Sequence, residues 1–146
     1  MNKKVDIKDL VPIMLEQLNA GKTVSFIPRG NSMQPLLGDG TDMVVLRKPE
    51  GRLHFFDMPL YYRKETDKYI LHRVVGFRKD GTYIMLGDNN AQREYDISDD
   101  DIVGVVTSFY RKGKMYSTKH PIYCLYCNVW YYTRPLRKVF SYVKRK

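Results

Sequence analysis

Residues 69–86 read YILHRVVGFRKDGTYIML, and this stretch decides the fold class. Apolar and β-branched residues fill both halves, which is typical of strands. The four residues between them, Lys79-Asp80-Gly81-Thr82, have the composition of a tight turn. The stretch therefore predicts a β-hairpin, with one strand over 69–75 and a returning strand over 83–86.

Other short apolar runs with turn residues between them lie on both sides of this hairpin. They predict strands near 24–28, 43–46, 60–63 and 102–106, followed by a turn at 111–114. Long crossover helices between these runs are missing, so the pattern predicts a compact, coiled β-sheet of the mainly β class and not a βαβ sheet.

One helix precedes the strands. Residues 6–20 carry apolar side chains at helical spacing, and Gly21 follows where a helix-ending glycine is favoured. A helix-turn-helix head would need a second helix here, so DNA reading by this segment is not expected. The expected apolar face consists of Leu10, Ile13, Met14 and Leu18.

The charge is distributed unevenly along the 146 residues, whose formal net charge is +9. Residues 111–146 contain ten Lys and Arg and no Asp or Glu, which leaves 15 basic and 16 acidic residues in 1–110. The length allows one core. We therefore divide the chain into a nearly neutral domain at 1–110, with its β-core over 23–106, and a basic aromatic extension at 111–146.

The extension predicts helices, because its apolar residues recur at helical spacing with basic residues opposite them. Three interpretations remain open: the apolar face packs on the body, the basic amphipathic helix lies on an anionic membrane, or the mixture of basic and tyrosine residues binds nucleic acid. Packing is the first expectation and nucleic acid the last. Trp130, Tyr131, Tyr132 and Phe140 would lie at the headgroup level of a membrane.

Two cysteines, Cys124 and Cys127, form a C-x-x-C pair. Neither a second cysteine pair nor a βαβ context accompanies them, so we expect two ordinary thiols and neither a zinc site nor a redox motif. No metal or nucleotide motif appears, and no cofactor is expected.

Residues 30–35 read Gly-Asn-Ser-Met-Gln-Pro and are the most informative stretch for chemistry. Ser32 follows a strand and a glycine, so its hydroxyl could project from a turn beside free backbone N–H groups that would form an oxyanion hole. Gly30, Asn31, Met33 and Pro35 are the candidate oxyanion and substrate-binding residues. Most serines in turns are structural, and Ser32 alone would be weak evidence.

A serine needs a base to become nucleophilic at neutral pH. His72 interrupts an otherwise apolar strand, where a histidine is either a hydrogen-bonded core residue or such a base. Asp88, in the Gly87-Asp88-Asn89-Asn90 turn, is either a structural turn residue or the acid that orients the imidazole of His72.

Together these three motifs, in this order and approximate spacing, resemble the type I signal peptidase and SOS-repressor peptidase superfamily over about residues 23–106. His72 followed by Arg73 is similar to the branch that uses histidine where most bacterial members use lysine. The resemblance implies a signal-peptidase-like fold with Ser32 as nucleophile, His72 as base and Asp88 as the assisting acid. That branch often has a second acid six residues later, which here is Glu94. Because exposed acids are common, we favour an ordinary surface or turn role for Glu94 and Asp96 over the catalytic one.

The expected function is cleavage of a specific protein or leader peptide by a serine endopeptidase. Alternatives are self-cleavage, for which Ala20-Gly21 is a small-small bond upstream of Ser32, and a non-catalytic peptide-binding module that retains the fold. The polar first residues and the absence of 18 consecutive apolar residues favour the cytoplasm, with the inner membrane face as a peripheral site.

Overall fold

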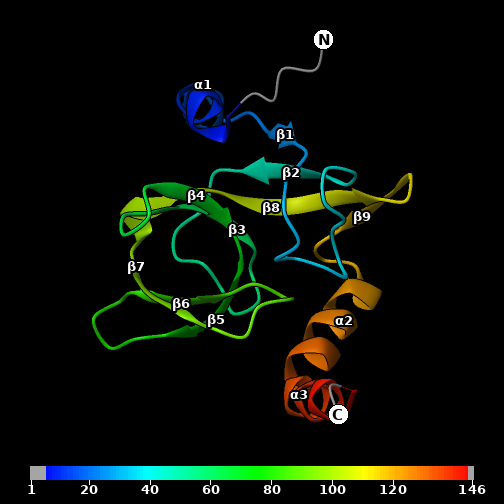
Figure 1. The fold of residues 1–146 in the computed structure, drawn as a ribbon. Coiled ribbons are helices and arrows are strands. Elements are labelled where there is room, and N and C mark those ends of the chain that lie inside the picture. The colour runs from blue at the N-terminus through cyan, green and yellow to red at the C-terminus, as the bar shows by residue number, and fades with distance from the viewer. Residues whose placement is uncertain (1–5, 145–146) are drawn as a thin grey trace.

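The computed structural model describes residues 6–144, with side chains through residue 139. Strands predominate, which confirms the mainly β class with one helix before the strands and helices after them (Figure 1). The elements are α1 (Ile7–Asn19), β1 (Val24–Phe26), β2 (Met43–Arg47), β3 (Pro59–Arg63), β4 (Lys68–Leu71), β5 (Arg73–Phe77), β6 (Tyr83–Leu86), β7 (Glu94–Ile97), a 3-10 turn (Asp99–Asp101), β8 (Ile102–Arg111), β9 (Lys114–Ser117), α2 (Pro121–Tyr132) and α3 (Arg134–Lys144).

Two antiparallel sheets form the body. The larger has the order β1-β2-β8-β3-β4 with β9 paired to β8, and the smaller has the order β5-β6-β7. The long strand β8 joins the larger sheet together, because it pairs with β2 along one edge and with β3 and then β9 along the other. The larger sheet curls, and β1 and β4, at the two ends of its strand order, each pair with a single strand within residues 6–144.

Helix α1 covers one end of the larger sheet (Figure 1). The side chain of Asp6 caps its first turn by accepting from the N–H of Lys8, and Gly21 follows with a positive φ of 81°. Val11, Met14 and Leu18 are buried, whereas Ile13 is 59% exposed. The expected face was therefore wrong at Ile13, because the stripe that packs on the sheet runs through Val11 instead.

The strand expected over 69–75 is interrupted at His72. Residues 68–71 pair with β3 in the larger sheet, and residues 73–77 pair with β6 in the smaller sheet. The hairpin turn at 79–82 is confirmed, with Gly81 at a φ of 89°. The chain thus changes sheets at His72, as strands do at the corners of packed sheets.

The C-terminal segment is joined to the body more closely than the expected boundary at residue 110 implied. Strand β8 continues to Arg111 and turns into β9, so the boundary falls inside a hairpin. Helix α2 then packs beside the body, and α3 follows at the end of the molecule opposite α1 (Figure 1). Across residues 6–144, each helix is too short or too polar to cross a bilayer.

Candidate active site

His72 lies at the junction of the two sheets and is only 5% exposed. Its neighbours along the chain pair with different strands, which fixes the backbone on both sides. A buried imidazole needs polar partners, because an unpaired polar group in a protein interior costs free energy. The partners of the two ring nitrogens therefore determine what His72 can do.

Glu94, the first residue of β7, is the acid that contacts His72. Its Oε1 lies 2.7 Å from Nδ1 of the imidazole, and both side chains are less than a tenth exposed. Oε2 forms an ion pair with Nε of Arg63 at 3.2 Å, without the alignment of a hydrogen bond. Burial alone would raise the pKa of Glu94, but the hydrogen bond and charge of His72, together with Arg63, outweigh burial and lower this pKa. Glu94 is therefore an ionised acceptor for Nδ1–H.

The hydroxyl of Tyr61 also lies beside this pair, 3.2 Å from Nδ1 of His72. Burial, and then the charge of Glu94 and a hydrogen bond to it, raise the pKa of Tyr61, so its hydroxyl stays protonated. With Nδ1 bound to a carboxylate, the neutral ring carries its proton there and leaves Nε2 as the basic nitrogen. Nε2 lies 3.4 Å from Nδ2 of Asn90.

Ser32 comes from the connection between β1 and β2 and lines a pocket of about 300 Å³ together with His72, Glu94 and Asn90. Its carbonyl oxygen accepts from the N–H of Asn89 at 2.8 Å, and Nδ2 of Asn89 donates to the carbonyl of Asn31 at 3.1 Å. The 87–90 turn thus holds the Ser32 segment beside His72. The structure brings together Ser32, His72 and Glu94 from three separate parts of the chain.

Gly87 is the point of closest approach in this arrangement. A methyl carbon there would lie 2.7 Å from the carbonyl oxygen of Ser32 and 3.0 Å from Nε2 of His72. We expect Gly87→Ala to lower the free energy of unfolding by roughly 1–3 kcal/mol, as overpacking does, and to reduce the reactivity of Ser32. Denaturant unfolding and labelling with a serine-directed probe measure the two effects.

Gly76→Ala is the matched control, because the nearest atom to its new methyl would be the mobile end of the Ile84 side chain at 3.1 Å. Its effect on unfolding should be smaller, and the reactivity of Ser32 should not change. Equal effects from the two substitutions would contradict the close packing around Gly87.

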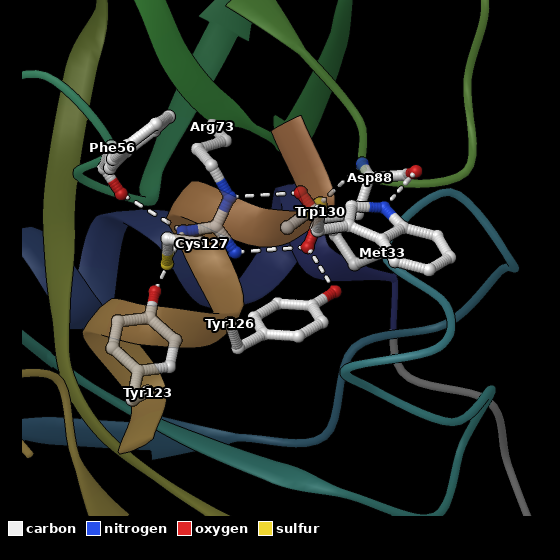
Figure 2. Close-up of polar contacts among 8 residues, drawn as sticks. All are labelled: Met33, Phe56, Arg73, Asp88, Tyr123, Tyr126, Cys127 and Trp130. Atoms are coloured by element: carbon white, nitrogen blue, oxygen red, sulfur yellow. Dashed lines mark hydrogen bonds and ion pairs between the residues drawn. The ribbon is translucent and has the colours of Figure 1, made fainter. Parts of the chain in front are cut away.

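Asp88 does not contact His72, and the expectation that it orients the imidazole was wrong. Its Oδ1 and Oδ2 instead accept from Nε and Nη2 of Arg73 at 2.8 and 2.9 Å (Figure 2). Both side chains are buried. Arg73 begins β5, directly after the chain changes sheets at His72, and its side chain is directed away from the Ser32 pocket. Asp88 pairs with Arg73 and is therefore directed away from the pocket as well. Glu94, the second candidate, holds the position beside His72.

Helix α2 encloses this ion pair with side chains that the sequence did not assign to the site (Figure 2). Arg73 donates to the hydroxyl of Tyr123 at 2.7 Å and to Sγ of Cys127 at 3.1 Å. Tyr126 donates to Oδ2 of Asp88, and the indole N–H of Trp130 donates to its carbonyl oxygen, both at 2.8 Å. The spacing of three and four residues between these side chains could have predicted their shared role from the sequence, because it places them on one face of a helix.

The two thiols of the C-x-x-C pair have different surroundings. Cys124 is exposed and Cys127 is buried against Arg73, and both are free. Burial raises the pKa of the Cys127 thiol, which disfavours the reactive thiolate.

The candidate oxyanion and substrate-binding residues divide into two groups. Gly30 and Met33 line the Ser32 pocket, but the N–H of Gly30 already donates to Oδ1 of Asp39 at 2.7 Å, and Met33 is buried. Asn31 and Pro35 do not line that pocket. Within residues 6–144, the N–H of Ser32 donates to no protein acceptor, and so it is the available donor for an oxyanion.

Ala20 and Gly21 form the capped end of α1 and do not line the pocket. The N–H groups of both residues donate to carbonyls of the last turn of that helix.

Comparison with known proteins adds no assignment: no family model and no curated protein matches this chain.

Proposed function

We propose that this protein is a serine endopeptidase in which Ser32 is the nucleophile, His72 the general base and Glu94 the acid that orients it. The observation that carries the proposal is the 2.7 Å contact between Glu94 and Nδ1 of His72, beside a pocket that Ser32 also lines. This arrangement would supply the three groups that such catalysis needs: a nucleophile, a base and a third group that orients the base.

In the proposed reaction, Nε2 of His72 accepts the proton of the Ser32 hydroxyl while Oγ attacks the carbonyl carbon of a peptide bond. Glu94 stabilises the resulting imidazolium, and the N–H of Ser32 donates to the oxyanion. The imidazolium then gives its proton to the leaving amine. Water, activated by the same nitrogen, hydrolyses the acyl-enzyme and restores the free serine.

A groove next to the pocket supports an extended peptide as the substrate. It has a volume of about 640 Å³ and is lined by the start of α1, by β3 and β4, and by the end of β1 with the three residues after it. The groove and the pocket share Pro28, Arg29, Tyr69 and Leu71. Strands β1 and β4 lie at the two ends of the larger sheet's strand order, each paired with one strand in the described part of the chain. Free strand edges pair with extended peptides, so a substrate strand between them would lead its scissile bond to Ser32.

The resemblance to the type I signal peptidase and SOS-repressor peptidase superfamily remains part of this proposal. Glu94 follows Asp88 by six residues, at the spacing that the resemblance gives for the second acid. The resemblance also implies that the substrate has small side chains next to the cleaved bond. We place the activity in the cytoplasm.

A fluorophosphonate probe tests the proposal, because it forms a covalent bond to an activated serine with loss of fluoride. We expect one adduct on the intact protein, mapped to Ser32 by peptide mass, and none on Ser32→Ala or His72→Ala. Ser25→Ala, on the exposed side of β1, is the control and should label as the wild type does. Failure of the folded wild type to label would overturn the proposal in favour of a non-catalytic peptide-binding module.

A further inference from the structure

The outer face of α2 and α3 is an apolar surface without a partner in the described chain. Six large side chains on these two helices are each at least 51% exposed. We call them the outer stripe: Ile122, Leu125, Val129, Tyr132, Leu136 and Val139. Spacings of three and four residues place the members within each helix on one side. Single exposed apolar residues are ordinary, but a stripe over two consecutive helices indicates an interaction surface.

Over its described side chains, residues 134–139, helix α3 has the reverse of the usual orientation of a surface helix. Its two arginines face the rest of the protein: Nη2 of Arg134 donates to the carbonyl of Asn90 on the body at 2.8 Å, and the guanidinium of Arg137 lies 3.6 Å from the ring centroid of Trp130 on α2. Its apolar residues Leu136 and Val139 are exposed instead. An amphipathic helix normally buries its apolar side against the core, so packing on the body does not explain this stripe.

The C-terminal segment that carries the outer stripe has charges of a single sign. Residues 111–146 contain ten basic residues and no acidic residue. Lys112, Lys114, Lys119 and Lys138 are exposed. A segment that combines exposed apolar side chains with exposed lysines fits a surface that combines hydrocarbon with negative charge, because long basic side chains reach headgroups while apolar groups insert.

We propose that the outer stripe docks this protein on the surface of a membrane containing anionic lipids. The helices would lie at the interface with Leu136 and Val139 among the acyl chains, while Arg134 keeps α3 attached to the body and Arg137 keeps it against α2. Because Arg134 is bonded to Asn90, and Asn90 contacts His72, the docked helices connect directly to the pocket.

Two other occupants fit the surface less well. A symmetric pair of these chains would bring the same basic surfaces together without acidic residues to neutralise them. Nucleic acid would match the charge, but it binds through phosphate contacts and aromatic stacking, which leaves exposed Leu and Val side chains unused.

Vesicle flotation tests the proposal. At low salt we expect the full chain to float with vesicles of phosphatidylcholine and phosphatidylglycerol. With vesicles of phosphatidylcholine alone, we expect the protein to stay at the bottom of the gradient. Leu136→Asn with Val139→Asn should lower binding about tenfold or more, since two apolar anchors are lost. Ile13→Asn with Phe77→Asn is the control, because these residues are comparably exposed but lie on α1 and β5, away from the outer stripe in the sequence. Circular dichroism verifies that both variants fold.

Equal binding of both double variants, or no binding of the intact chain to anionic vesicles, would overturn the proposal. It would also be overturned if the Leu136/Val139 variant lost self-association in sedimentation, or lost binding to a single-stranded oligonucleotide, while vesicle binding was unchanged. Ser32→Ala should float like the wild type, so the outcome is independent of whether Ser32 is a nucleophile.

Discussion

Glutamine in place of Glu94 is expected to slow the reaction of Ser32 with a fluorophosphonate by roughly 10²–10⁴-fold, the range for losing an orienting acid or a general base. Glutamine keeps the size of the side chain but removes the charge that holds the Nδ1–H tautomer and stabilises the imidazolium. The carboxylate contacts Nδ1 at 2.7 Å, so the loss acts directly on the base. The observed rate of adduct formation by intact mass measures the effect.

Asp96→Asn is the control for this substitution, because Asp96 lies on the same strand but is exposed and forms an ion pair with Arg78 on the protein surface. Its positive φ of 64° suits asparagine, so the backbone should not be strained. Labelling should continue at the wild-type rate. If Glu94→Gln also labelled at that rate, Glu94 would have no role in activating His72.

Alanine in place of Asp88 is expected to lower the free energy of unfolding by about 3–5 kcal/mol, because it leaves the buried charge of Arg73 without its partner. The hydroxyl of Tyr126 would lose its acceptor as well. Both losses occur where α2 packs on the body, so that helix should separate first. Denaturant unfolding gives the free energy, and the fluorescence of Trp130, the only tryptophan, reports on α2.

Two comparisons distinguish this role from a general effect of lost charge. The double variant Arg73→Met with Asp88→Leu should be more stable than Asp88→Ala, since neither charge is then buried alone. Lys8→Met breaks the exposed ion pair with Asp67 and should change stability little. A small effect of Asp88→Ala would contradict the stabilising role that we assign to the buried pair.

Local patterns were sufficient to predict most of the secondary structure. Alternating apolar residues and the Asp80-Gly81 turn predicted the 83–86 strand, and Gly21 marked the end of α1. The outer strands β7 and β9 were missed, because their short, polar sequences resemble loops. Ser32 and His72 were identified because their motifs occur together, and the structure lines one pocket with both.

Sequence by itself determined the mainly β class, the helix at each end of the strands and the candidate pair Ser32 and His72, since propensity, turn composition and motif order are local properties. Only the tertiary structure decided which acid contacts His72. Asp88 lies in the connection after β6, and Glu94 begins β7 at the end of that connection. The change of sheet at His72 places Arg73 and Asp88 on one side and leaves Glu94 on the other. The tertiary structure likewise decided that α3 directs Arg134 and Arg137 inward and exposes Leu136 and Val139, because Asn90 and Trp130 offer polar and aromatic contacts there. A helical pattern specifies two faces, but the surface it meets decides which of them is buried.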